Sequence, residues 1–195
     1  MQTTNIQHAA KKYFESVSVS LHGVDLDKVE KIARILFHAY KSDKKIILIG
    51  NGGSAATASH FVCDLGKGVS LPGKKKFKVL ALCDNIPTMT AYANDCSYED
   101  IFMEQLKNIV EAGDVVVAIS GSGNSKNVLK AVELANQYPA ITIGLTGFEG
   151  GRLKGLVSEC LIIANNTMEQ VEDIHLVILH AIKLVLIGML EEDKG

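Results

Sequence analysis

The residues most able to do chemistry lie in two Gly/Ser-rich segments, each of which follows a short apolar run. Glycine lets the backbone turn tightly and approach a ligand, and the first N–H groups of a following helix favour an anion. Serine hydroxyls add further donors. The two segments therefore predict one phosphorylated ligand held from two sides by Gly50, Asn51, Gly52, Gly53 and Ser54 and by Ser120, Gly121, Ser122, Gly123, Asn124 and Ser125.

Neither segment matches a common nucleotide-binding pattern. No Lys-Ser/Thr pair closes a P-loop, and the glycines do not have the G-x-G-x-x-G spacing of dinucleotide sites. We therefore expect no nucleotide cofactor. The competing interpretation is that both segments are ordinary turns of an α/β sheet, and their occurrence together disfavours it.

A histidine and a carboxylate follow the first segment at helical spacing. His60 and Asp64 are four residues apart, so their side chains share one helix face about 6 Å apart along the axis. Imidazole and carboxylate suit zinc and its neighbours, although two ligands do not complete a site. Further ligands must come from elsewhere in the chain or from another subunit.

The apolar C-terminal segment contains an unusual group of polar residues: Glu172, Asp173, His175 and His180. A lone histidine in such a helix is more often a hydrogen-bonded core residue, but the neighbouring carboxylates favour a function. Glu172 and His180 lie about 12 Å apart along a helix axis. Either both side chains reach a common point, or the site lies between subunits.

Together these groups suit the isomerisation of a sugar phosphate. A carboxylate can remove the proton beside a carbonyl, a histidine or a metal can stabilise the enediol oxygen, and the proton then returns to the neighbouring carbon. This aldose–ketose chemistry requires no redox cofactor.

The elements that position these residues alternate along the chain. A helix is predicted near 6–21 and an amphipathic helix near 26–40, followed by short apolar strands near Ile46, Val79, Val115, Ile141 and Leu161 with helices between them. This order predicts an α/β fold with a doubly wound parallel sheet of about five strands. Both Gly/Ser segments then lie at carboxyl ends of strands, where such sheets bind ligands.

The 195 residues contain no linker, so we expect a single domain over 1–195, with N-terminal helices in 1–42 and the sheet core and C-terminal helix in 43–195. The helix predicted from Met168 to about Leu190 is apolar on most faces. One sheet face cannot cover such a helix, so we expect it to form an oligomer interface.

Charge and composition limit the classes of partner that the protein is expected to bind. The net charge of −2 argues against nucleic acid, and the apolar run 184–190 is too short to span a bilayer, which needs about 20 residues. The first five residues lack a signal-peptide pattern, and the four cysteines form no C-x-x-C pair. We expect a cytoplasmic protein that binds a small molecule and neither nucleic acid nor membrane.

Several segments taken in order resemble the sugar isomerase (SIS) domain, and more closely the phosphoheptose isomerases. They are Gly50 to Ala56, His60-Phe61, Thr90 to Asp95, Ser122 to Ser125, Leu145 to Gly147 and Glu172 to His175. The resemblance covers nearly the whole chain. It implies the interconversion of sedoheptulose 7-phosphate and D-glycero-D-manno-heptose 7-phosphate by a homotetramer with sites at subunit interfaces.

The resemblance also implies roles for individual residues. Asp64 is the base and His180 the acid, and zinc or another divalent transition metal binds to His60, Asp64, Glu172 and His180. The substrate phosphate is held by Ser54, Ser120, Ser122 and Ser125, beside Gly52, Gly53 and Gly121. Asn51 and Asp95 meet the sugar chain, and Glu172 borders the substrate.

Three positions depart from the family pattern. Asp64 stands where Glu is usual, Glu172 where Gln is usual, and Gly121 where Thr is usual. The shorter Asp64 and the missing hydroxyl leave another ketose phosphate, such as a hexulose or pentose phosphate, as an alternative substrate. A further alternative is a non-catalytic SIS module of the kind that binds a sugar phosphate or associates with the bacterial replication initiator.

Overall fold

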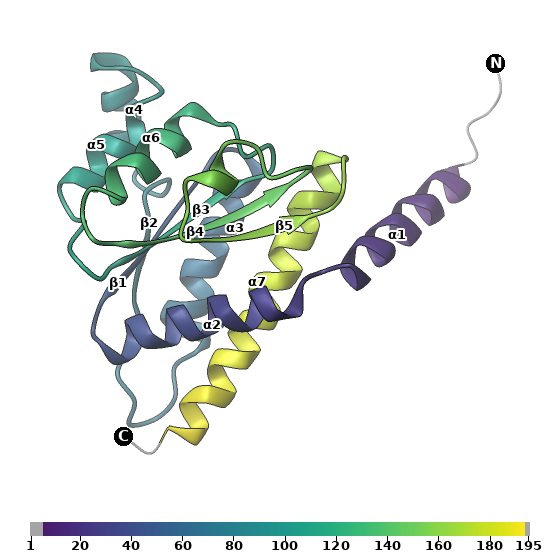
Figure 1. Cartoon of the computed structure of the whole chain (residues 1–195), viewed down its shortest axis with the longest axis horizontal. Coiled ribbons are helices and arrows are strands. Elements are labelled where there is room, and N and C mark those ends of the chain that lie inside the picture. Colours follow the sequence, from purple (N-terminus) through teal and green to yellow (C-terminus); the bar gives the residue numbers. More distant parts are fainter. Residues whose placement is uncertain (1–5, 194–195) are drawn as a thin grey trace.

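A computed structural model of the chain describes residues 6–193, and residues 1–5, on which the signal-peptide argument rests, lie outside them. A central sheet lies between two layers of helices (Figure 1). In chain order the elements are α1 (Ile6–His22), α2 (Leu26–Lys41), β1 (Lys45–Gly50), α3 (Gly53–Cys63), η1 (Asp64–Gly68), β2 (Lys78–Ala81), α4 (Ile86–Asp95), α5 (Ile101–Lys107), β3 (Val115–Ser120), α6 (Lys126–Ala135), β4 (Ile141–Gly147), η2 (Leu153–Gly155), β5 (Glu159–Ile163) and α7 (Met168–Glu192).

The sheet has five parallel strands in the order β2-β1-β3-β4-β5. Each predicted strand is present, so the expectation of a doubly wound parallel sheet is confirmed. The chain order reverses direction at β1, and the neighbouring strands β1 and β3 both end in a Gly/Ser segment. That position is the topological switch point where such sheets bind ligands.

Alternate residues of the central strands supply two separate cores. Ile46 and Leu48 of β1 pack into the core on the face covered by α2, α3 and α7. Ile47 and Ile49 pack into the opposite core with residues of α5 and α6. A strand buried on both faces must be apolar throughout, which explains the unbroken apolar runs of the sequence.

Helix α7 is the longest element, with 25 residues, and extends beyond the predicted end near Leu190. Within residues 6–193 it is the one helix whose length and composition would allow it to cross a membrane, a possibility not apparent from the seven-residue apolar run alone. Nine of its residues are buried against the rest of the chain. It packs as a core helix against β4, β5 and the helices α2 and α3.

Helix α1 extends away from the body (Figure 1). None of its residues is buried, and Phe14 and Val19 are 69% and 74% exposed. It is attached to the body by Val17 and Leu21, which are partly buried against the core, and by polar contacts to α7, among them the Tyr13 hydroxyl, which donates to Asp173 Oδ2 at 2.5 Å. An isolated helix of this length is marginal in water, so its apolar side needs a further surface to cover it.

His175 is a fully buried histidine on the core side of α7. Its Nε2 lies 3.1 Å from the Thr146 carbonyl oxygen, which can only accept, so Nε2 carries the proton. Nδ1 is buried without a hydrogen-bond partner. Burial lowers the pKa of His175 to about 4, against a smaller opposing effect of the Thr146 hydrogen bond.

This burial predicts a loss of stability in acid. Between pH 6.5 and 4 the unfolded chain takes up a proton at His175 and the folded chain does not, so the unfolding free energy should fall by about 3 kcal/mol in total. Urea unfolding of the wild type and of His175→Gln across this range measures the difference. Carboxylates titrate equally in both proteins, so identical pH slopes would contradict the assignment.

Candidate active site

The two Gly/Ser segments form the walls of one small cavity of about 170 Å³ at the carboxyl ends of β1 and β3. The predicted residues that line it come from both segments and from the start of α7. They are Asn51, Ser54, Ser120, Gly121, Ser122, Ser125 and Glu172, joined by Ile119 and Met168. Gly52 and Gly53 lie next to this group in the chain, at the start of α3.

Close packing explains the glycines of both segments. A Cβ on Gly53 would lie 2.4 Å from Glu172 Oε2, and one on Gly123 would lie 2.1 Å from the carbonyl oxygen of Gly150. Both Gly52 and Gly123 also have positive φ, 54° and 63°. A side chain at Gly53 would displace the Glu172 carboxylate, and one at Gly123 would push the loop after β4 away from the cavity.

Two helices point their N-terminal ends at this cavity. Helix α3 begins at Gly53 and α6 begins at Lys126, directly after Ser125. The Ser125 hydroxyl does not cap its own helix and instead accepts a hydrogen bond from Ser120 Oγ at 3.3 Å. The first two N–H groups of each helix can therefore face an anion beside the serine hydroxyls, whereas the next ones already donate, Ala55 to the Asn51 carbonyl and Val128 to Asn127 Oδ1.

An amide pair that sequence reasoning missed joins the two segments. Asn51 Nδ2 donates to Asn127 Oδ1 at 2.8 Å, and Asn127 Nδ2 donates back to Asn51 Oδ1 at 2.9 Å. The Tyr98 hydroxyl donates to the same Asn51 oxygen at 3.0 Å. Asn127 is buried, and its position two residues after Ser125 in the predicted helix was the available signal.

Helices α3 and α7 lie side by side and run in the same direction. Gly53 contacts Glu172 at the start of the pair, and further along His60 contacts His180 and Asp64 contacts Lys183. In each pair the α7 residue follows its partner by 119 or 120 positions. The two helices therefore keep a nearly constant register from the cavity to a second group of polar residues.

That second group consists of His60, Asp64 and His180, whose ligand atoms all lie within 4.8 Å of one another. The two Nε2 atoms are 3.0 Å apart, and Asp64 Oδ2 lies 3.3 Å from His180 Nε2 and 3.7 Å from His60 Nε2. Two imidazole nitrogens and a carboxylate oxygen converge here, as the spacing of His60 and Asp64 had predicted for one helix face.

The donor set suits a divalent transition metal. Asp64 Oδ2 is buried and has no hydrogen-bond partner, which a bound cation would provide. Two histidines and one carboxylate are a common set at catalytic metal sites, which hold three protein ligands and keep another position open. The structure thus contains a possible metal site, formed by residues from α3, η1 and α7.

Glu172 lies at the other end of the helix pair. Its carboxylate is beside Gly53 and borders the cavity, two turns of α7 before His180. Burial raises the pKa of Glu172, and the carboxylates of Glu169 and Asp173 raise it further. Within one chain the structure does not bring Glu172 to the three converging groups, so its role as a metal ligand stays a prediction.

Asp95 belongs neither to the cavity lining nor to the group of His60, Asp64 and His180. It ends α4 and is exposed, and its Oδ1 accepts a hydrogen bond from Asn94 at 2.8 Å. It is not among the residues that line the cavity. Its predicted contact with the sugar chain stays a prediction.

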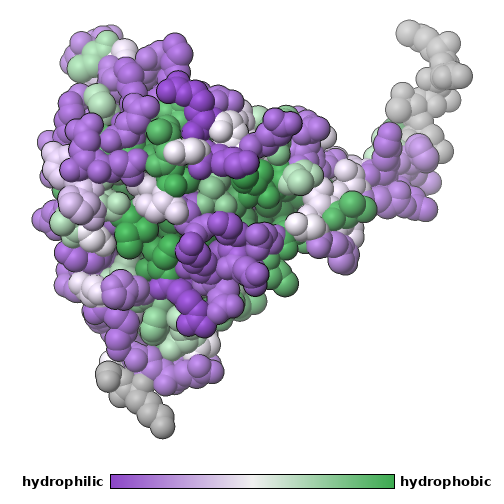
Figure 2. Space-filling model, in the orientation of Figure 1, coloured by the Kyte–Doolittle hydropathy of each residue, from purple (hydrophilic) through white to green (hydrophobic). Residues whose placement is uncertain are grey.

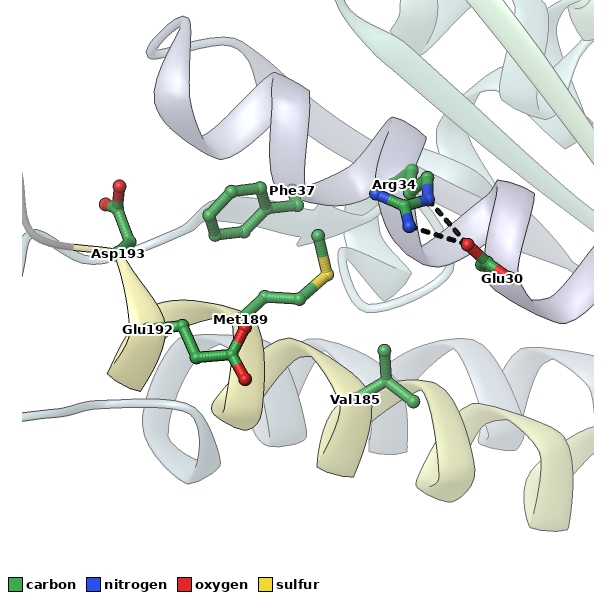
Figure 3. A pocket seen from close by; sticks show the side chains of 7 residues that line it. All are labelled: Glu30, Arg34, Phe37, Val185, Met189, Glu192 and Asp193. Carbon is green, nitrogen blue, oxygen red and sulfur yellow. Dashed lines mark hydrogen bonds and ion pairs between the residues drawn. The ribbon is translucent and has the colours of Figure 1, made fainter.

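A larger groove of about 420 Å³ lies between α2 and α7 (Figure 3). It contains none of the residues predicted to act in chemistry. Its lining combines apolar and charged side chains: Phe37, Val185 and Met189 with Glu30, Arg34, Glu192 and Asp193. The chemical groups therefore identify the small cavity together with the group of His60, Asp64 and His180, and not the larger groove, as the candidate active site.

Comparison with known proteins agrees with this assignment. Residues 4–147 match the SIS domain. A probable phosphoheptose isomerase of Thermoplasma acidophilum is 39% identical over 173 residues, which cover 89% of this chain and 94% of that protein. The phosphoheptose isomerase of Helicobacter pylori is 34% identical, with coverage of 90% and 92%.

The fold agrees with a solved structure as well. The phosphoheptose isomerase of Neisseria gonorrhoeae superposes with a TM-score of 0.84 at 28% identity, covering 92% of this chain and 97% of that one. The similarity extends over nearly all of both chains.

The reciprocal amide pair predicts a measurable coupling between the two Gly/Ser segments. In a double-mutant cycle of Asn51→Ala and Asn127→Ala, the unfolding free energies should be non-additive by about 1 to 3 kcal/mol, because each change removes the other's partner. Urea denaturation measures all four proteins. Tyr98→Phe, which removes one exposed donor to Asn51, serves as the control with a smaller effect, and additive values would show that the pair is not coupled.

Proposed function

This chain belongs to the SIS domain family, and from that membership we propose that it is an aldose–ketose isomerase that interconverts sedoheptulose 7-phosphate and D-glycero-D-manno-heptose 7-phosphate. One observation supports this most strongly. The parallel packing of α3 and α7 connects the Gly/Ser cavity, which suits an anion, to the separate group of His60, Asp64 and His180, which suits proton transfer. The names of the relatives above point to the same reaction.

The separation of the two groups suits a long sugar. His60 follows Gly53 by seven residues, which is about 10 Å along α3. In sedoheptulose 7-phosphate the phosphate is on the last carbon, and the reacting carbons are at the opposite end of the chain. With the phosphate in the Gly/Ser cavity, the sugar would extend along the seam between α3 and α7 toward the histidines.

The proposed reaction uses residues of this chain as base and acid. The Asp64 carboxylate takes the proton from C1 of the ketose while His180 donates a proton to the carbonyl oxygen on C2, which gives the enediol. Return of a proton to C2 and loss of the proton from the C1 hydroxyl complete the aldose, so no net proton is gained or lost.

Zinc is the metal we propose for His60, Asp64 and His180, with Glu172 as the remaining family ligand. When bound, such a cation would polarise the sugar oxygens. The serine hydroxyls of the cavity and the N-termini of α3 and α6 hold the phosphate, and Asn51 and Asp95 contact the sugar hydroxyls. The whole chain, residues 1–195, acts as one domain in this proposal.

We also propose that the chain works as a homotetramer in the cytoplasm. Helix α1 has no buried residue, and Val177, Leu184 and Val185 of α7 are 45%, 68% and 42% exposed. On the face shown in Figure 2, apolar surface lies around the middle of the molecule and close to the place where α1 leaves the body. The groove of Figure 3, with Val185 in its lining, adds to the area that a second copy would cover.

The proposal predicts zinc-dependent turnover of sedoheptulose 7-phosphate, followed as the aldose product by NMR with metal-free and zinc-loaded protein. Asp64→Asn and His180→Gln should each lower kcat by a factor of about 100 or more, because each removes a proton-transfer group. Ser122→Ala should instead raise KM about tenfold or more, the effect of one charge-assisted hydrogen bond of about 1.5 to 3 kcal/mol.

Each contrary result would contradict a different part of the proposal. Retained turnover in Asp64→Asn or His180→Gln would remove that residue from the mechanism. An unchanged KM in Ser122→Ala would place the phosphate elsewhere. Binding of the sugar phosphate without turnover would direct attention to other ketose phosphates. A protein that neither binds a metal nor turns over any of them would be a binding module of the same family.

The assembly predicts a mass of about four chains of 21.0 kDa by light scattering after gel filtration. Phe14→Asp should lower this mass, because it puts a charge on the exposed apolar side of α1. Lys12→Ser, a polar change on the same helix, is the control. A monomeric wild type, or an unchanged mass for Phe14→Asp, would contradict the role of α1.

A further inference from the structure

Lys183 is the one lysine of α7, which contains no arginine, and it points at the candidate metal site. Its Nζ donates to Asp64 Oδ1 at 2.5 Å, and its side chain is only 25% exposed. The Asp64 side chain is 9% exposed. This is a largely buried ion pair, so it differs from the solvent-exposed pairs that contribute little.

The backbone around Asp64 leaves room for this lysine. Helix α3 changes at Asp64 into the π-helical turn η1, in which the Val69 N–H donates to the Asp64 carbonyl oxygen at 2.9 Å. The turn ends at Gly68, where a Cβ would lie 2.8 Å from Lys183 Cε. A glycine at this position therefore lets the lysine stem pass close to the backbone.

The two oxygens of Asp64 have different surroundings. Oδ1 is held by Lys183, whereas Oδ2 has no hydrogen-bond partner and lies 3.3 Å and 3.7 Å from the Nε2 atoms of His180 and His60. A carboxylate fixed through one oxygen presents the other in a defined direction. Hydrogen bonds from outside the ligand set commonly orient metal ligands in this way.

We propose that Lys183 is a positioning residue that holds Asp64 so that Oδ2 alone faces the metal. The proposal rests on the metal site of the proposed function and assigns it a partner outside the ligand set. Donation of a hydrogen bond to Oδ1 is the required property, and the positive charge of Lys183 is not. Lys183 follows His180 by three residues, so the two side chains lie on the same helix face.

The test measures metal affinity without using turnover. Zinc competition against a chromogenic chelator gives the dissociation constant, and the visible spectrum of the cobalt-loaded protein reports the ligand geometry. Lys183→Met removes the donor and keeps an apolar stem, Lys183→Gln keeps a neutral donor, and Lys183→Arg keeps a charged one. Lys67→Met is the matched control, because Lys67 is an exposed lysine of η1.

Lys183→Met should weaken zinc binding 10- to 100-fold, the usual effect of removing such a partner, and should change the cobalt spectrum. Lys183→Gln and Lys183→Arg should retain most of the affinity, and Lys67→Met should match the wild type. Circular dichroism and sugar phosphate binding check that each variant is folded. If Lys183→Met does not fold, Lys183→Gln and Lys183→Arg still test the proposal, because it requires both variants to retain most of the zinc affinity.

Two results overturn the proposal while leaving the metal site intact. Lys183→Met with equal or tighter zinc binding would show that the lysine only opposes the cation. Loss of affinity in Lys183→Gln equal to that in Lys183→Met would show that charge, and not donation, matters. A wild-type protein that binds no zinc would instead refute the metal site itself, and the role of Lys183 with it.

Discussion

The close, parallel packing of α3 against α7 is the constraint on which the candidate site depends. The two helices are far apart in the sequence, yet they stay in step from Gly53 and Glu172 to Asp64 and Lys183. At the start of the pair the Glu172 carboxylate lies against Gly53, where a Cβ would be 2.4 Å from its Oε2. Close-packed helices resist relative sliding, so both ends of the site are fixed together.

The same packing explains why the site has two chemically different ends. At the N-terminal end of α3, free N–H groups and serine hydroxyls favour an anion. About two turns later, helix geometry presents His60 and Asp64 to α7, where His180 and Lys183 meet them. A ligand with a phosphate at one end and a reactive carbonyl at the other matches this order of groups.

Polar groups buried near the seam are each stabilised by a defined partner, with two informative exceptions. Asn51 and Asn127 satisfy one another, and Lys183 satisfies one oxygen of Asp64. Among described side chains, the buried atoms without a partner are Asp64 Oδ2 and His175 Nδ1. Asp64 Oδ2 lies among possible metal ligands. His175 Nδ1 belongs to an imidazole that burial keeps neutral.

The sequence by itself determined the parallel five-stranded sheet, the two Gly/Ser turns and the pairing of His60 with Asp64, because strand runs, turns and helix spacing are local properties. The family resemblance had also placed His180 with this pair. Only the tertiary structure decided that His180 reaches it within one chain while Glu172 stays at the cavity, and that Asn127 and Lys183 hold Asn51 and Asp64. The contacts of His180, Glu172 and Lys183 depend on how far α7 slides along α3, and helix periodicity does not encode that register. The Asn51–Asn127 pair depends instead on the pairing of β1 with β3, which brings the segments after these strands together.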